Sequence, residues 1–130
     1  MNPRSALFDE IATRTGFRYG FGGQAHPVPA ELLSDWERLR PSWKQVHGVK
    51  VHEVLSASQA CGENDGLWTR APAQGVAVVT ADCVPILLAR KDGKAVAALH
   101  AGWRGTRGRI VDTFCDILER EDESPSNWVA

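Results

Sequence analysis

Residues 85–101, PILLARKDGKAVAALHA, contain two apolar runs joined by a short polar turn. The runs cover residues 85–90 and 95–101, and the dipeptide Asp92-Gly93 lies between them. Asp-Gly suits the type I′ turn of a tight hairpin, because both central residues of that turn need a positive φ. The stretch therefore predicts a β-hairpin.

The segments around the hairpin predict further strands and helices. Within residues 106–120 the apolar side chains fall on one stripe, which predicts an amphipathic helix with Ile110, Val111, Phe114, Ile117 and Leu118 on its buried face. Runs rich in β-branched or aromatic residues predict strands at 17–21, 43–47, 49–55 and 75–80. Shorter helices are predicted at 9–15 and 30–40, a polar loop at 56–66, and the start of a further strand at 128–129.

Composition excludes several classes of protein. The chain has 130 residues, a common size for one domain, and its 15 Lys and Arg balance 16 Asp and Glu. This balance argues against a nucleic-acid partner that is held by a basic field. The apolar runs are too short to span a membrane. The start of the chain does not look like a signal peptide, and the cysteine count of three is odd, so we expect reduced thiols and a cytoplasmic location.

Three candidate ligands lie at the ends of predicted strands: His47, Cys83 and His100. Two imidazoles and a thiolate make a zinc set, and three protein ligands leave one position open for water or substrate. The alternative is a packed core cysteine with two hydrogen-bonded histidines. The residue types and their spacing leave both interpretations open.

Two further residues lie beside these ligands. The turn Gly102-Trp103-Arg104-Gly105 leads into the predicted helix, where backbone N–H groups and Arg104 would bind an anion and Trp103 would stack on a flat ring. The alternative is an ordinary tight turn with Trp103 in the core. Asp82, next to Cys83, would orient a ligand or carry a proton, or serve only as a turn residue.

The remaining cysteines and histidines carry no expected chemistry. Cys61 in the polar loop and Cys115 beside the apolar stripe of the last helix are expected to be structural. His26 in a Pro-rich loop and His52 on an alternating strand are expected at the surface, because neither belongs to a recognisable ligand motif.

Three blocks of the sequence, in this order, resemble the signature blocks of the YfiH, or laccase-domain, family. They are KQVHG at 44–48, TADCVPILL at 80–88 and LHAGWRG at 99–105. The intervening NDGL at 64–67 resembles the family's Ala-Asp-Ala-Leu segment, and the whole resemblance covers residues 43–118.

The resemblance implies a fold, a metal and an activity. The implied fold is α+β, with mixed β-sheet layers flanked by helices, and the implied zinc ligands are His47, Cys83 and His100. Family members phosphorolyse adenosine, inosine, guanosine and methylthioadenosine, and deaminate adenosine. The resemblance therefore implies a zinc-dependent purine nucleoside phosphorylase and adenosine deaminase that takes a nucleoside and phosphate. Its expected catalytic residues are Cys83, Asp82 and Arg104.

Other functions stay open beside this one. The family has also been described as copper-dependent, laccase-like polyphenol oxidases, and one bacterial branch is tied to editing of peptidoglycan precursors. A laccase needs a copper cluster with many histidines, and this chain has four. A further alternative is a non-catalytic metal-binding module that pairs with another chain.

Two departures from the family pattern bear on substrate binding. The stretch Gly20-Phe21-Gly22-Gly23 lacks the arginine of the family's Ser-Thr-Arg-x-Gly-Gly block. The family also carries a Gly-Pro-x-Ile-Gly-x-Cys-Cys-Tyr block about where residues 127–130 stand. We therefore expect residues 1–130 to form one domain of this family without its C-terminal block.

Overall fold

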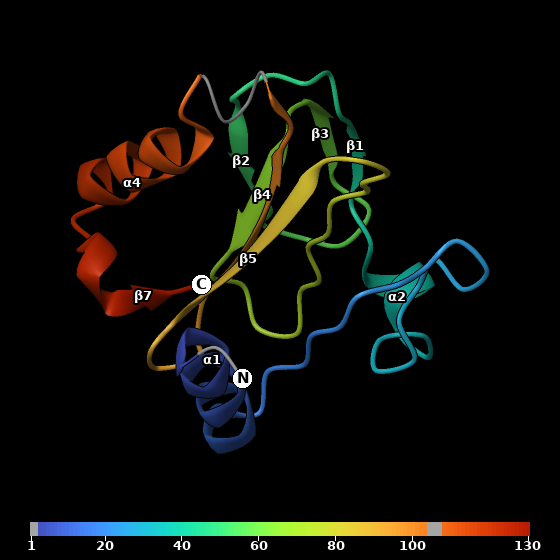
Figure 1. Ribbon diagram of the computed structural model, residues 1–130, viewed down its shortest axis with the longest axis horizontal. Helices are drawn as coiled ribbons and strands as arrows, with labels where there is room; N and C mark the ends of the chain where they lie inside the picture. The colour runs from blue at the N-terminus through green and yellow to red at the C-terminus, as the bar shows by residue number, and fades with distance from the viewer. Residues whose placement is uncertain (1–2, 104–107) are drawn as a thin grey trace.

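A five-stranded mixed sheet forms the centre of the computed structural model, which describes residues 3–103 and 108–130 (Figure 1). Its strand order is β2-β4-β6-β5-β7, with β2 and β4 parallel and every other pair antiparallel. The strands are β2 (Val51–Glu53), β4 (Gly66–Thr69), β5 (Val84–Arg90), β6 (Val96–Ala101) and β7 (Trp128–Val129).

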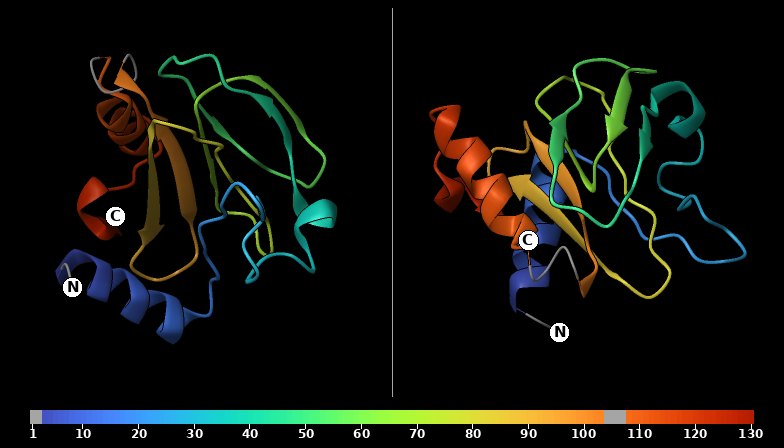
Figure 2. Two further views of the ribbon diagram at one scale, coloured as in Figure 1. Left: turned by 45° about the vertical axis from the view of Figure 1, so that its right-hand side comes forward. Right: turned by 90° about the horizontal axis from the view of Figure 1, so that it is seen from above.

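A second, two-stranded sheet and several helices surround this sheet. The second sheet pairs β1 (Ser42–Lys44) with β3 (Ala60–Glu63) in parallel. The helices are α1 (Pro3–Thr15), α2 (Trp36–Leu39), α4 (Ile110–Arg120) and the 3-10 helix η1 (Pro125–Asn127). Helix α4 contacts β2 and β6, and α1 contacts β7; β1 and α4 lie on opposite sides of the five-stranded sheet (Figures 1 and 2). The α+β class is confirmed.

The predicted hairpin is confirmed, but its turn differs from the prediction. Strands β5 and β6 pair from Val84 opposite Ala101 to Ala89 opposite Val96. In the turn, Gly93 has a φ of +71° whereas Asp92 lies outside the left-handed region, so a type I′ turn is wrong.

Gly93 is needed at this turn for its conformation and for its lack of a side chain. Its N–H donates to the Arg90 carbonyl at 2.8 Å, which closes the turn. A Cβ at position 93 would lie 2.0 Å from Oγ1 of Thr15 at the end of α1. The end of α1 therefore packs directly on the hairpin turn.

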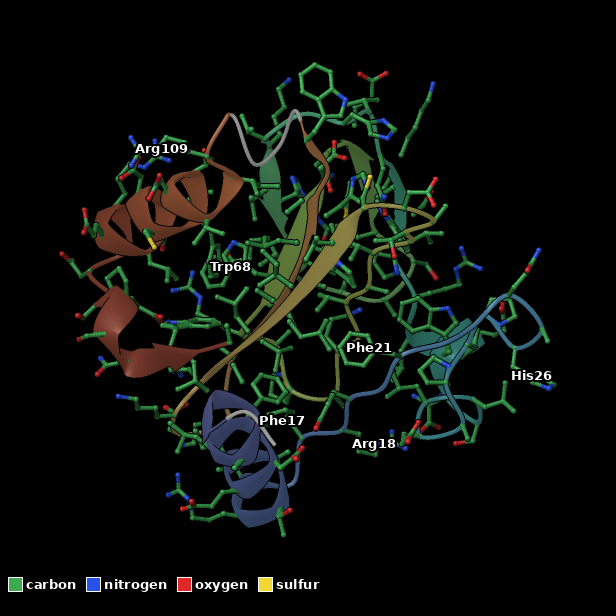
Figure 3. All side chains as sticks on the ribbon, viewed as in Figure 1. Phe17, Arg18, Phe21, His26, Trp68 and Arg109 are labelled. Atoms are coloured by element: carbon green, nitrogen blue, oxygen red, sulfur yellow. The ribbon has the colours of Figure 1, made fainter. Side chains whose placement is uncertain are left out.

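The main core lies between α4 and one face of the five-stranded sheet. Ile110, Phe114 and Leu118 are buried along one stripe of α4, and Ile117 packs against the same core, as predicted. Placing Val111 on this stripe is wrong, because its side chain is 39% exposed. Phe114 contacts the rings of Trp68 and Trp128 edge-on, with centroid distances of 5.9 and 5.2 Å. Figure 3 shows Trp68 in the space between α4 and the sheet.

Two predicted strands do not form. Residues 17–21 pair with no strand of the described chain; instead Phe17 and Tyr19 pack edge-on against Phe8 of α1, at 5.4 and 4.8 Å. Residues 75–80 also lie outside both sheets. There the Gln45 side chain forms two hydrogen bonds with the main chain of Val79, donating to its oxygen and accepting from its N–H, both at 2.7 Å.

The polar loop predicted at 56–66 contains strand β3, and strand β4 begins at its last residue. Strand β3 contains Cys61, which is buried, so placing Cys61 in a loop is wrong. Strand β4 is buried along its whole length. Gly66 begins β4 where a Cβ would lie 2.7 Å from the Leu99 side chain, so the glycine permits close pairing with β6.

The predicted helices form in part. Residues 9–15 belong to the longer α1, whereas only α2 forms as a helix within 30–40. Helix α4 begins at Ile110, because Arg109 adopts a left-handed φ of +63°, and the start predicted at residue 106 lies outside the described residues. Within the described part of the chain, no helix is long and apolar enough to cross a membrane.

We expect Phe114→Ala to lower the free energy of unfolding by about 3–5 kcal/mol, because it removes a fully buried ring from the core. Val111→Ala is the matched control on the same helix, since its side chain is 39% exposed and should cost no more than about 1 kcal/mol. Urea unfolding followed by circular dichroism measures both values. Equal losses from the two variants would contradict the core described above.

Candidate metal centre

Three potential metal donors converge at the end of the β5–β6 hairpin. A ring nitrogen of His47, the Sγ of Cys83 and a ring nitrogen of His100 all lie within 4.8 Å of one another. His47 is exposed, Cys83 is half-buried and His100 is buried. The two imidazoles meet edge to face, with their ring centroids 5.1 Å apart. The donor set therefore has a closed side at His100 and an open side at His47.

The hairpin register brings Cys83 beside His100. Pro85 pairs with His100 and Val84 with Ala101, so the residue before β5 lies at the far end of β6. Gly102 follows β6 there, and a Cβ on it would lie 3.1 Å from Cys83 Sγ and 3.5 Å from His47 Cδ2. The space beside the sulfur stays open because residue 102 has no side chain.

His47 reaches the hairpin from a loop that follows β1. Its φ is +59°, a left-handed conformation that is uncommon for a residue other than glycine. The backbone N–H groups of Val46, His47 and Gly48 all donate to the Asp65 carboxylate, at 2.9 to 3.0 Å. These three hydrogen bonds hold the loop in its unusual conformation.

The same carboxylate contacts His100. Asp65 is fully buried, and its Oδ2 lies 2.7 Å from His100 Nδ1. Burial raises the pKa of Asp65, but the hydrogen bonds from His100, Gly48, Val46 and His47 outweigh it and hold the pKa below its usual range. Asp65 is therefore an ionised acceptor between two ligand-bearing segments.

The sequence alone does not single out Asp65 as a site residue. It follows a polar stretch and precedes a glycine, which is the composition of an ordinary turn. The only signal is the likeness of residues 64–67 to the family's Ala-Asp-Ala-Leu segment.

The donor set suits a metal ion of the zinc type. Zinc ligands lie about 2.0–2.3 Å from a tetrahedral ion, so their atoms lie roughly 3.5 Å apart. The donor atoms here lie within 4.8 Å, and movements on the order of 1 Å would complete that geometry. Two further features are typical of a zinc site: the Asp65 carboxylate contacts His100 Nδ1, and Gly102 places no side chain beside the Cys83 sulfur. The cluster is a possible metal site, and the assignment of its ligands stays a prediction.

The sequence also predicted Asp82, Trp103 and Arg104 as site residues, and the structure describes the first two of them. Asp82 is exposed in the turn immediately before Cys83, and the carboxylate that touches a ligand histidine is Asp65. Arg104 lies outside the described residues. Trp103 is 68% exposed, so its alternative placement in the core is wrong.

The remaining histidines and cysteines lie away from the donor cluster. His26 projects from a loop at the edge of the molecule (Figure 3), and His52 Nε2 lies 2.9 Å from the Gln59 amide nitrogen. Burial raises the pKa of the Cys61 thiol. Burial, and then nearby acidic side chains, raise that of Cys115.

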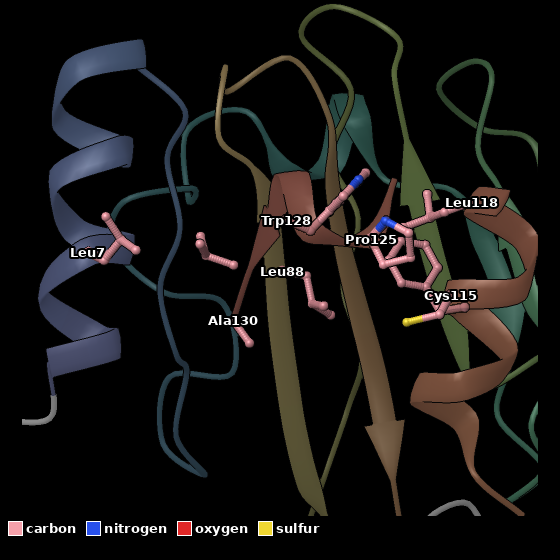
Figure 4. Close-up of a pocket in the computed structure, with 9 residues that line it drawn as sticks. Leu7, Leu88, Cys115, Leu118, Pro125, Trp128 and Ala130 are labelled. Atoms are coloured by element: carbon pink, nitrogen blue, oxygen red, sulfur yellow. The ribbon is translucent and has the colours of Figure 1, made fainter. Parts of the chain in front are cut away.

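Cys115 lines a separate apolar hollow of about 340 Å³. Figure 4 shows this hollow between α1, the strands β5 and β7, and α4, with Leu88 and Trp128 in its wall. None of the three donors of the candidate metal centre lines it. The hollow and the donor cluster are thus different features of the molecule.

The fold and the donor cluster together describe an α+β protein with a candidate His–Cys–His metal centre at the end of a β-hairpin. The chain belongs to the family described as multi-copper polyphenol oxidoreductase laccase, whose model matches residues 30–130. The resemblance to the YfiH or laccase-domain family is thereby confirmed.

Similar proteins carry the name purine nucleoside phosphorylase. One from Synechocystis is 45% identical over 80 residues, which are 56% of this chain and 30% of the relative. Purine nucleoside phosphorylase YfiH of Escherichia coli is 33% identical over 91 residues, which are 69% of this chain and 37% of the relative. The match thus spans about a third of the length of these relatives.

Solved structures show the same fold. The crystal structure of YlmD from Geobacillus stearothermophilus superposes with a TM-score of 0.63 and 31% identity, over 74% of this chain and 41% of that one. A Bacillus licheniformis protein titled YfiH superposes with a TM-score of 0.59 and 30% identity, over 71% of this chain and 40% of that one.

We expect Gly102→Ala to lower zinc affinity about tenfold, because its Cβ would press on Cys83 Sγ and displace a donor by a few tenths of an ångström. Gly23→Ala is the control, since nothing lies within 4 Å of the Cβ it would add. Competition with a chromophoric chelator measures the affinity. Equal affinities for both variants would contradict the close approach at Gly102.

Thiol titration of the denatured, metal-free protein should find three free thiols per chain. The structure holds Cys61, Cys83 and Cys115 as separate free cysteines. A value near one would mean that two of them form a disulfide, against the geometry described here.

Proposed function

We propose that the chain binds zinc through His47, Cys83 and His100 and acts as a purine nucleoside phosphorylase that also deaminates adenosine. The convergence of the three donors within 4.8 Å, in a chain related to purine nucleoside phosphorylases at 33–45% identity, carries the proposal. Its substrates would be phosphate and adenosine, inosine, guanosine or methylthioadenosine. In this proposal residues 1–130 act as one domain.

The charge of the ligand set favours an anion or a polarised group at the open position. One thiolate and two neutral imidazoles carry a single negative charge together. Zinc held by this set would keep about one positive charge, attract phosphate and lower the pKa of a bound water towards about 7. Because His100 is buried and His47 is exposed, a substrate would approach the metal from the side of His47.

Exposed apolar side chains lie within three residues of the ligands in sequence. Val46 precedes His47, Val84 follows Cys83, and Trp103 follows Gly102, and all three are large side chains that are at least 41% exposed. A flat purine ring packs well on such surfaces, and Trp103 offers the largest face for it. These residues would therefore hold the base, while the donor cluster faces the ribose and phosphate.

Asp82 and Arg104 are proposed for the proton and the phosphate. Asp82 is exposed next to Cys83, where it can exchange a proton with solvent and pass it to the departing base. Arg104 stands two residues after Gly102, and its guanidinium suits the oxygens of phosphate.

Zinc suits the site better than a laccase copper cluster. Two imidazoles and one thiolate can hold a single electron-transfer copper, but reduction of oxygen by a laccase needs several copper ions and many histidines. Among the described residues, His47, Cys83 and His100 are the one group of three or more donors close enough for a metal. Copper oxidation of phenols, hydrolytic editing of peptidoglycan precursors and a non-catalytic metal-binding module are the alternatives.

The free cysteines favour a location in the cytoplasm. Disulfides are common in oxidising compartments and rare in the cytoplasm, and Cys61, Cys83 and Cys115 are unpaired with one another. We therefore propose a cytoplasmic enzyme.

Elemental analysis of the purified chain, combined with a chromatographic assay of adenosine with and without phosphate, tests the proposal. Zinc near one per chain, phosphate-dependent release of adenine and formation of inosine would support it. Copper with oxidation of phenols would favour the laccase alternative. Metal without turnover of any nucleoside would favour the non-catalytic module.

We expect Cys83→Ala to abolish both metal retention and nucleoside turnover, because it leaves two imidazoles, which are too few for tight zinc binding. Asp82→Asn should keep the metal and lower the turnover number about 10²-fold if Asp82 moves a proton. Metal content and turnover are measured on the same samples of both variants.

Cys115→Ala is the matched control for the thiol, since Cys115 lines the apolar hollow and not the donor cluster. It should retain metal and turnover. Full metal and full turnover in Cys83→Ala would exclude the proposed centre, and the family's chemistry would then not apply to this chain.

A further inference from the structure

We infer that Asp65 is the positioning residue of the candidate metal centre. Its carboxylate fixes the tautomer of His100 and the loop conformation of His47, so that both imidazoles offer a nitrogen lone pair to the same point. The inference rests on the proposed metal site and adds a residue that acts through two of its ligands.

One carboxylate receives four N–H groups. Its Oδ1 accepts from the backbone N–H of Val46 and Gly48, at 3.0 and 2.9 Å. Its Oδ2 lies 3.0 Å from the His47 backbone nitrogen and 2.7 Å from His100 Nδ1. Three of the four contacts of the carboxylate are therefore made with the main chain of the His47 loop, and the fourth is made with the ring of His100.

The contact with Oδ2 determines where His100 carries its proton. Oδ2 already accepts the His47 backbone N–H, and a carboxylate oxygen that accepts from both neighbours fits this geometry, so we assign the donor role to Nδ1 of His100. In the neutral ring this leaves the lone pair on Nε2, which is the nitrogen available to a metal. A carboxylate on the second nitrogen of a ligating histidine is a common device for orienting the ring.

The contacts with the loop determine where His47 points. His47 has a φ of +59°, and three consecutive backbone N–H groups turn towards the same carboxylate. These hydrogen bonds compensate for an uncommon backbone conformation. Without them the loop would relax, and the His47 ring would leave its position 5.1 Å from the His100 ring.

The main chain of Asp65 is itself fixed on both sides. Its N–H donates to the Lys50 carbonyl at 2.9 Å, and its carbonyl accepts from the His100 N–H at 2.7 Å. The residue is completely buried, so its carboxylate makes these contacts without competition from bulk water. Asp65 therefore sets the separation of two histidines that stand far apart in the sequence.

Asp65→Asn tests the inference, because an amide is nearly isosteric but offers one acceptor oxygen and one donor NH2 group. If the NH2 group faces His100, its Nδ1 must accept, and the proton moves to Nε2. If the NH2 group faces the loop, the N–H groups of Val46 and Gly48 lose their acceptor. The first orientation also deprives the His47 backbone N–H of its acceptor, so either orientation disturbs at least one of the two histidines.

The experiment has two readouts besides activity. Long-range ¹⁵N–¹H correlation spectra of the metal-free wild type should show His100 protonated on Nδ1. In Asp65→Asn, zinc affinity measured by chelator competition should fall about 10–100-fold. Circular dichroism checks that the variant is folded.

Glu63→Gln is the matched control, because it neutralises an exposed carboxylate at the end of β3, two residues before Asp65. Its zinc affinity should lie within twofold of the wild type. A comparable loss in Glu63→Gln would mean that charge near the site, and not the position of Asp65, controls affinity, and would overturn the inference.

Two other results would overturn it. One is a wild-type spectrum with His100 protonated on Nε2; this readout needs no variant and decides the question even if Asp65→Asn does not fold. The other is a folded Asp65→Asn that binds zinc within twofold of the wild type. A wild-type chain that binds no metal would instead overturn the proposed function. The spectrum of the metal-free protein would still test whether Asp65 sets the tautomer of His100, because that measurement does not depend on metal binding.

Discussion

The register of the β5–β6 hairpin is the constraint on which both the core and the candidate site depend. Side chains alternate between the two faces of a strand, so Leu99 packs under α4 while His100 points to the other face. A slip of one residue would exchange these two side chains between the core and the site. The same register places Cys83 opposite the end of β6, so one pairing aligns two of the three donors.

The face that carries the site buries polar groups, which requires that they be hydrogen-bonded. Asp65 and His100 are almost completely inaccessible to water. Their contact, together with three N–H groups from the His47 loop, satisfies the carboxylate that burial would otherwise destabilise. Removing one of these four partners would weaken the compensation of a buried charge, so the site and the fold stabilise each other.

Local patterns predicted the parts of the fold that local forces determine. The hairpin and the apolar stripe of α4 follow from residue periodicity, which needs no information about distant segments. The aromatic alternation at 17–21 was misinterpreted because those rings pack on α1 and not on a sheet. Strand β3 was missed because Gly62, Glu63 and their neighbours have the composition of a loop, and their pairing with β1 is a tertiary effect.

The candidate site was also predictable only where local patterns reveal it. His47, Cys83 and His100 stand at strand ends and in recognisable blocks, whereas the role of Asp65 arises only from contacts across 17 to 35 positions of sequence. Such contacts close long loops, which costs conformational entropy that a local hairpin does not lose, so no local pattern indicates them. Cys83 and His100 lie at one end of the hairpin, whereas His47 comes from a separate loop whose N–H groups donate to Asp65. A metal held by all three side chains would tie that loop to the hairpin, and part of its binding free energy would then stabilise the fold.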